Sequence, residues 1–453
     1  MVIVQDVLPE LKGFLRETGL SAMRCSMVAR FVIAFVMHRG RMSASQAAGA
    51  VRCEPVHRSQ ACRFLCRAFW QSKAILPALR DAVLILSAPK GDLIFVLDQT
   101  LCSQQGDRTE NTYSTGNRQK RPRKGRRYNK YKYARKRCHC FVMGLLITPE
   151  GHRIPFSKSY YTDDYCKKTG RPYRKQTELA ADLIRELPVP KGASLVVLGD
   201  TAFDAVTIRQ ACADRLCTWI VPINPERVLA GEKPRPKVSS LVKDLSAGQF
   251  TPVRLLPGCG PFVAQRRVSP HRMGPKTKPR TFYVHQESRD VHSVGEVRLV
   301  FSTRTRPQKG KPVDVQKTLM TNDQTLPVAT IVELYDLRWQ IELFFKELKS
   351  TLGFHQYRFQ KFDAVERWVE MALTAFLFLE WLRAERLRRR DLTAEQKRWW
   401  RAQRTYGLCQ AVRQMAEQHE LKFLAQRLRT RYGLNQLRRL FRDAPTREYR
   451  CPI

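Results

Sequence analysis

Four polar side chains within residues 335–349 combine one acid with three groups that bind phosphate. Their sequence, YDLRWQIELFFKELK, places Tyr335, Arg338, Glu342 and Lys349 at spacings of three, four and seven residues. On one α-helix, at about 100° per residue, these four side chains fall within a roughly 60° arc. The pattern predicts a polar stripe beside an apolar packing face. Its chemistry indicates a phosphate substrate, although the same charges also suit an ordinary solvated helix surface.

Two aspartates upstream each follow a short apolar segment that predicts a buried strand. Asp98 comes directly after residues 93–97, and Asp200 follows residues 195–198 and a glycine that lets the backbone turn. A helical segment, residues 205–216, comes next. Taken alone, either aspartate also suits a turn or a helix cap. The order of two strands ending in Asp and then a helix carrying Glu favours one shared site.

Three carboxylates brought to one point form an oxygen-lined site that suits two Mg²⁺ or Mn²⁺ ions. Histidine and cysteine would select softer metals. Two such ions, about 4 Å apart, activate a water or a 3′-hydroxyl and stabilise the leaving oxygen. Phosphodiester cleavage and strand transfer can then share one site without a covalent protein nucleophile.

The helix spacing resembles the Y-x2-R-x3-E-x6-K motif of bacterial insertion-sequence transposases of the insertion-sequence-four family, whose catalytic triad is Asp, Asp, Glu. The Asp-x-Thr that this family often shows is matched by Asp98 and Thr100. The resemblance implies that Asp98, Asp200 and Glu342 are the catalytic residues and hold two Mg²⁺ (or Mn²⁺) ions. It also implies a ribonuclease-H-like α/β core with a β-rich insertion.

The same resemblance assigns DNA contacts beside the scissile bond to Tyr335, Arg338 and Lys349, which in that family also help hold a flipped base. The base-stacking aromatic is not evident, and Trp219 and Phe262 are the two candidates. The implied reaction is cut-and-paste transposition, in which the freed 3′-hydroxyl forms a hairpin at the transposon end before joining target DNA. Two DNA ends must meet, so the resemblance implies a homodimer in the synaptic complex.

The charge of the chain agrees with a DNA partner. Lysine and arginine number 81 against 41 aspartates and glutamates, which gives a formal net charge of +40. Such a chain binds DNA non-specifically at low salt, but charge alone says nothing of catalysis. Because 43% of the residues are apolar, the chain can bury sizeable cores, unlike a disordered basic tail.

A basic loop, residues 118–137, interleaves cations with three tyrosines. It follows the first predicted catalytic strand, and this position favours contact with DNA over a merely solvated loop. Its candidate DNA-binding residues are Arg123, Lys124, Arg126, Arg127 and Lys130.

Alternating apolar and polar patterns predict a mixed α/β core between flanking helical regions. Residues 1–90 are expected to be a helical DNA-binding domain, with a basic packing domain as the alternative. The other expected parts are 91–222 (first part of the core), 223–325 (β-rich insertion), 326–385 (second part of the core) and 386–453 (basic helical C-terminal region). Further strands are predicted at 140–147, 154–160, 218–222, 281–285, 297–302 and 319–321, with a helix at 175–187.

Thirteen scattered cysteines and the lack of an export signal predict reduced thiols and a cytoplasmic protein. No apolar run is long enough to span a bilayer, so no membrane partner is expected. Together these features predict a DDE transposase that cleaves transposon ends and joins them to target DNA. Two alternatives remain: a DNA-binding regulator derived from a transposase, and a metal-dependent nuclease.

Overall fold

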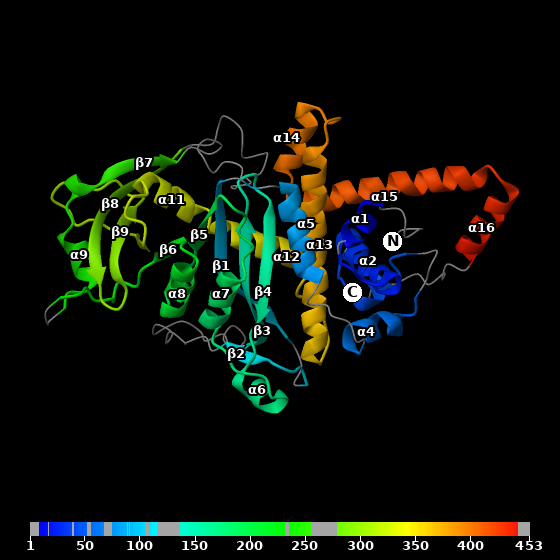
Figure 1. Ribbon diagram of the computed structural model, residues 1–453, viewed down its shortest axis with the longest axis horizontal. Helices are drawn as coiled ribbons and strands as arrows, with labels where there is room; N and C mark the ends of the chain where they lie inside the picture. Colours follow the sequence, from blue (N-terminus) through cyan, green and yellow to red (C-terminus); the bar gives the residue numbers. More distant parts are fainter. Residues whose placement is uncertain are drawn as a thin grey trace, which may run out of the picture. The chain divides into compact units, whose positions relative to one another are not determined.

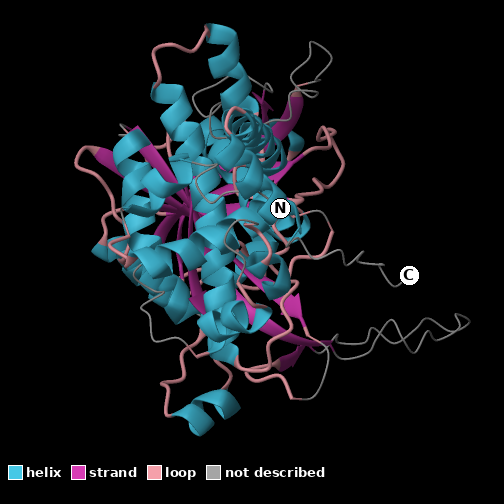
Figure 2. Cartoon of the chain, turned by 90° about the vertical axis from the view of Figure 1, so that its right-hand side faces the viewer, coloured by secondary structure: helices cyan, strands magenta, loops and turns pink. Residues whose placement is uncertain are grey.

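The computed structural model of the chain describes residues 9–16, 18–38, 40–51, 56–67, 75–87, 89, 91–104, 108–115, 136–231, 235–255 and 279–442. The chain divides into two compact units. The helical unit comprises residues 1–86, 346–391 and 403–453, and the sheet unit comprises residues 87–345 and 392–402. All described strands belong to the sheet unit, and the elements of the described helical unit are helices (Figures 1 and 2).

One ten-stranded mixed sheet organises the sheet unit. Its order is β2-β3-β1-β5-β6-β10-β9-β8-β7, and β4 also pairs with β3 (Figure 1). Strands β1, β5 and β6 are parallel neighbours, while all other pairs are antiparallel. The strands are β1 (Gly91–Ser103), β2 (Tyr113–Thr115), β3 (Lys136–Ile147), β4 (Arg153–Ser159), β5 (Ala193–Leu198), β6 (Thr218–Pro222), β7 (Thr251–Leu255), β8 (Arg280–Val291), β9 (Gly295–Thr303) and β10 (Lys317–Thr321).

The central strand β1 owes its position to the apolar run predicted from the sequence. All five side chains from Leu93 to Leu97 are fully buried, as expected of a strand covered on both faces. Its neighbour β3 approaches closely at Gly144, where an added Cβ would lie 1.9 Å from Cζ of Phe95. Glycine at this position therefore leaves room for the Phe95 ring.

Strands β7, β8 and β9 lie within residues 223–325 and extend the same sheet. The connection runs through β10, in which Leu319 pairs with Pro222 of β6 on one side and with Val300 of β9 on the other. The β-rich segment is therefore continuous with the strands that carry the two aspartates.

Most of the predicted strands and helices are present, although β1 and β8 each extend six residues beyond the predicted strand ends at 97 and 285, and helices pack against the sheet. In the sheet unit, α7 packs on β3 and β4, and α8 packs on β6 and on α7 (Figure 1). The helices of this unit are α6 (Asp163–Thr169), α7 (Gln176–Arg185), η4 (Thr201–Phe203), α8 (Val206–Asp214), α9 (Val238–Asp244), η5 (Ala247–Gln249), α11 (Val328–Asp336), the first part of α12 (Trp339–Ser350) and α14 (Ala394–Ala402).

The long helix α13 is the centre of the helical unit, and α1, α2, α4 and α15 contact it. Trp368 of α13 is fully buried and meets the Phe35 ring edge-on at 4.9 Å. No described helix is both long enough and apolar enough to cross a membrane. The remaining helices are α1 (Pro9–Arg16), α2 (Ala22–Met37), α3 (Ala44–Ala48), α4 (Arg58–Cys66), α5 (Ile75–Ser87), α13 (Phe362–Arg388), α15 (Thr405–Leu428) and α16 (Arg431–Arg442).

Candidate functional site

Asp98 and Asp200 both lie close to the end of the parallel pairing between β1 and β5. The last paired residues of β1 and β5 are Val96 and Leu198, and each aspartate lies two residues further on. Because side chains alternate along a strand, a step of two keeps the same face. Neighbouring strands lie about 4.8 Å apart, so this register brings the two carboxylates to one edge of the parallel pairing.

The prediction that Asp98 follows the end of its strand is wrong. β1 continues to Ser103, and Asp98 pairs with Met143 of β3. The reason is the long antiparallel partner, which keeps hydrogen bonding to β1 after the parallel pairing with β5 has ended. Asp98 Oδ1 accepts a hydrogen bond from the Gln99 amide at 2.7 Å.

Asp200 ends its strand as predicted and also caps the next turn. Its Oδ1 accepts a hydrogen bond from the Ala202 amide at 2.9 Å, which begins the short helix η4. Gly199 precedes it in a tight space, where an added Cβ would lie 2.9 Å from the Phe203 Cβ. The capping role and a role in a shared acidic site are therefore compatible, because capping uses only one carboxylate oxygen.

The predicted single helix over residues 335–349 is wrong, because two helices meet inside it. Tyr335 lies near the end of α11, whereas Glu342 lies in the first turn of α12. At the junction, the amides of Leu337 and Arg338 donate to carbonyls three residues back, as in a 3₁₀ turn. Asp336 also makes a bidentate ion pair with Arg280 of β8. The tertiary contact and the tight turn thus override the continuous helical pattern.

Arg338 stands between two of the predicted catalytic acids. Its Nη2 donates to Glu342 Oε1 at 2.7 Å, and its Nη1 lies 3.9 Å from Asp98 Oδ2. The Arg338 side chain is only 17% exposed, so solvent screens these charges weakly. Burial of the Arg338 guanidinium lowers its pKa, but the interactions with Tyr335 and Glu342 raise it by more. The pKa of Arg338 is therefore raised.

The surroundings of Asp98 change the pKa of its carboxyl group. Burial, followed by the nearby charges of Asp200 and Glu342, raises its pKa to about 6, against the lowering effects of the Gln99 amide and Arg338. Two other carboxylates therefore act electrostatically on Asp98. Mutual repulsion of this kind marks a site that would be stabilised by added positive charge.

Tyr335 is less accessible than a residue expected to bind phosphate. Its side chain is 9% exposed, and the Lys317 ammonium lies 4.9 Å from the centre of its ring. Burial raises the pKa of Tyr335 to about 12, and Asp200 and Glu342 also raise it. Burial and the nearby Arg338 and Arg304 lower the pKa of Lys317. Sequence reasoning missed Lys317, which precedes a short strand and belongs to no motif.

A cavity of about 590 Å³ lies beside this cluster in the sheet unit. Four cations and three aromatic side chains contribute to its wall, and its one acid, Asp336, is paired with Arg280. Trp339 stands at this cavity with 55% of its side chain exposed. The charged and aromatic lining residues are Arg280, Arg304, Lys317, Arg338, Phe282, Tyr335, Trp339 and Asp336.

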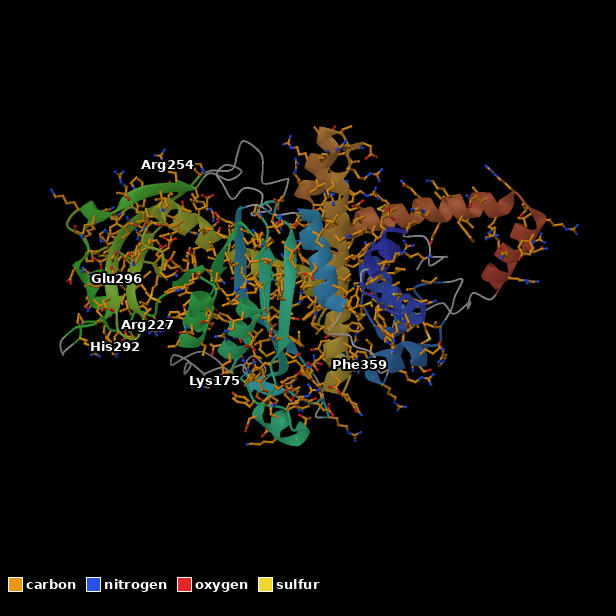
Figure 3. The ribbon with its side chains drawn as sticks, in the orientation of Figure 1. Lys175, Arg227, Arg254, His292, Glu296 and Phe359 are labelled. Carbon is orange, nitrogen blue, oxygen red and sulfur yellow. The ribbon has the colours of Figure 1, made fainter. Side chains whose placement is uncertain are left out.

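The turn that carries Asp200 is held by a buried ion pair. Asp204 is 4% exposed and accepts hydrogen bonds from Arg209 of α8 and from Arg227, the latter at 2.6 Å. Figure 3 labels Arg227 near His292. His292 lies in the turn between β8 and β9, and its amide donates to the carbonyl of Val228. These contacts tie the turn after β5 to the extended part of the sheet.

The remaining predicted contact residues belong to other segments of the chain. Lys349 lies in the last turn of α12, which belongs to the helical unit. Arg123, Lys124, Arg126, Arg127 and Lys130 lie outside the described residues, as does Phe262. Trp219 is 5% exposed in β6, so it is a core residue and not an open stacking platform.

The acidic residues fit a hard divalent cation by their chemistry. All three are carboxylates, and Asp200 and Glu342 each keep one oxygen free of hydrogen bonds to described residues. No group of three or more His, Cys, Asp or Glu side chains in the described part of the chain is close enough to form a metal cluster. Asp200 and Glu342 act on Asp98 through their charges, over distances longer than those of shared metal coordination. In this arrangement Glu342 is paired with Arg338.

Most of the sequence matches a known protein family. The family model for the transposase DDE domain matches residues 89–378. A comparison with curated proteins found no match. The matched region covers more than half of the chain and includes β1 with Asp98, the Asp200 turn and the Glu342 helix. The chain therefore belongs to the transposase DDE domain family.

Proposed function

We propose that this protein is a cut-and-paste DNA transposase of the insertion-sequence-four type, with Asp98, Asp200 and Glu342 as its catalytic acids. One observation carries this assignment: the charges of Asp200 and Glu342 both act on Asp98, and each aspartate lies two residues beyond the last parallel pair of β1 and β5. Family membership supports transposase activity and a DNA substrate. The residue roles are inferred from the geometry and from the motif spacing.

The three acids would hold two Mg²⁺ or Mn²⁺ ions, which supply activation of a water or 3′-hydroxyl and stabilisation of the leaving oxygen. Arg338 suits bidentate contact with a phosphate, and its place beside the acids aims that contact at the scissile region. Tyr335 positions Arg338 and lines the cavity. Lys349 would add a phosphate contact from the end of α12, the helix that carries Glu342.

The surrounding architecture supports the finer parts of the proposal. Strands β4, β3 and β1 form an antiparallel set, followed by the parallel strands β5 and β6, which agrees with a ribonuclease-H-like core. Residues 1–90 would bind DNA, and 223–325 would contribute to DNA binding and hairpin formation. Two copies would hold two transposon ends in the synaptic complex.

Cleavage of duplexes that carry candidate element ends tests the assignment. Wild type and Glu342→Gln are compared with Mg²⁺, with Mn²⁺ and with a chelator, while DNA binding is followed by gel shift. We expect metal-dependent cleavage in wild type, its loss in Glu342→Gln, and binding in both. Glu296→Gln is the matched control, because Glu296 is exposed at the start of β9 (Figure 3).

The products separate the alternatives. Joined target DNA indicates a transposase, cut ends without joining indicate a nuclease, and binding without cleavage by wild type indicates a regulator. Equal cleavage by wild type and Glu342→Gln would remove Glu342 from the catalytic site.

A further inference from the structure

Arg338 lies between the acidic site and the cationic cavity, and it contributes to both. On one side its guanidinium donates to Glu342 at 2.7 Å and lies 3.9 Å from Asp98. On the other side it lines the cavity with Arg280, Arg304 and Lys317. A single side chain therefore faces two groups of opposite charge.

The contact with Glu342 opposes a divalent cation at the acids. Glu342 Oε1 is occupied by the guanidinium, and Asp98 is close enough for a charge interaction with it. A guanidinium at this distance also repels any second cation that approaches the same carboxylates. Because the Arg338 side chain is 17% exposed, water cannot screen that repulsion well.

The cavity offers Arg338 a different set of partners once an anion enters it. Lys317 lies over the Tyr335 ring and Arg304 over the Phe282 ring, which places two further cations at the wall. Arg280 is held there by its ion pair with Asp336. A phosphate in this cavity would be attracted by all of them, and the planar guanidinium forms strong bidentate bonds with phosphate as well as with carboxylate.

We propose that Arg338 couples DNA binding to metal binding at the three acids. Without DNA, its guanidinium neutralises Glu342 and Asp98 and weakens their affinity for a divalent cation. A DNA phosphate in the cavity draws the guanidinium away and releases the Glu342 carboxylate. The acidic site thus becomes competent for metal only when a DNA phosphate occupies the cavity.

This inference rests on the proposed function, since it takes Asp98, Asp200 and Glu342 as the metal ligands. Thermodynamic linkage gives this coupling between DNA binding and metal binding a measurable size. If DNA raises the affinity for metal by a given factor, metal must raise the affinity for DNA by the same factor. Arg338 is the residue through which that factor is expected to act.

The experiment measures Mn²⁺ binding by the loss of the free-ion signal in electron paramagnetic resonance. The full-length protein is titrated alone and with a saturating duplex that carries a candidate element end, and the duplex alone is the blank. We expect DNA to tighten Mn²⁺ binding by wild type about tenfold or more. Arg338→Gln should bind Mn²⁺ tightly without DNA, and added duplex should change that affinity by less than about twofold.

Two further variants sharpen the result. Arg338→Lys keeps a positive charge and should retain weak Mn²⁺ binding in the absence of DNA. Arg280→Gln removes a cation from the far side of the cavity, so it should weaken DNA binding yet keep the DNA-dependent gain in Mn²⁺ affinity. Circular dichroism checks that each variant is folded.

The outcomes separate this inference from the proposed function. If Mn²⁺ binding is lost in Asp98→Asn but is the same in wild type and Arg338→Gln, the coupling by Arg338 is overturned while the acidic site stands. Equal Mn²⁺ affinity of wild type with and without duplex overturns the coupling as well. If Asp98→Asn leaves Mn²⁺ binding unchanged, the three-acid site itself is wrong.

Discussion

Asp98 and Asp200 each lie two residues beyond the last paired position of two adjacent parallel strands. The pairing of β1 with β5 therefore brings the two acids to the same end of these strands. The two differ in what fixes them: Asp98 sits inside a strand, whereas Asp200 caps a short helix. Within β1, burial raises the pKa of Asp98.

Replacing Asp98 by Asn should abolish cleavage and stabilise the fold at neutral pH. The folded-state pKa of Asp98 is about 6 against an ordinary value of 3.8, so its ionised form is disfavoured in the folded protein. Stability is full below about pH 4 and falls as pH rises through 6. We expect Asp98→Asn to raise the free energy of unfolding by about 1–3 kcal/mol at pH 8. Urea denaturation at pH 8 and pH 4 checks this, and an equal gain at both pH values would contradict it.

Replacing Lys317 by Gln should weaken DNA binding without destabilising the protein. Lys317 lines the cationic cavity, and partial burial together with Arg338 and Arg304 lowers its pKa; loss of its charge therefore removes a phosphate contact and also reduces the repulsion among these cations. The slope of log affinity against log salt should fall by about 0.9 for one lost contact. Lys309→Gln, in the exposed turn before β10, is the charge-matched control. An identical slope change in both variants would mean that Lys317 has no specific role.

Replacing Gly144 by Ala should destabilise the sheet unit. The new methyl group would meet Cζ of Phe95 at 1.9 Å, which forces the ring or the strand to move. We expect a loss of about 1–3 kcal/mol in the free energy of unfolding, measured by urea denaturation. A second change, Phe95→Leu, should recover part of that loss. Gly248→Ala, where nothing lies within 4 Å, should have little effect, and equal losses at both glycines would refute the steric explanation.

Replacing Asp204 by Asn should disturb both stability and catalysis. Asp204 is 4% exposed and is paired with Arg209 and Arg227, so its removal leaves two guanidinium groups without their shared partner. The expected cost is about 3–5 kcal/mol, and cleavage should fall because the Asp200 turn loses its anchor. Thermal unfolding and single-turnover cleavage measure the two effects. Asp214→Asn breaks an exposed pair with Arg185 and should have a much smaller effect on stability.

Local patterns in the sequence were sufficient for the element types near the site. The apolar run before Asp98 predicted a buried strand, and all five of its side chains are buried. The alternation of apolar and polar residues likewise predicted β8, β9 and β10. These features depend on contacts within a few residues, so periodicity reports them directly.

The break between α11 and α12 could not be predicted in this way. The residues on either side of Leu337 keep a helical pattern with no proline or glycine to mark an end. What interrupts the helix is a tight turn together with the ion pair between Asp336 and Arg280, which is 56 residues away in the chain. An ion pair between residues so far apart in the chain produces no recognisable pattern in the sequence around the helix end.

The sequence by itself determined the spacing of Tyr335, Arg338 and Glu342 and the strongly basic charge, and it predicted which three acids form the site. The tertiary structure alone decided that Asp98 and Asp200 follow the last parallel pair of two adjacent strands, that Arg338 binds Glu342 close to Asp98, and that the Lys317 ammonium lies over the Tyr335 ring. The physical reason is the range of the interactions. Helices and strands arise from neighbours along the chain, whereas an active site is assembled by strand pairing and charge contacts between residues that only folding brings together.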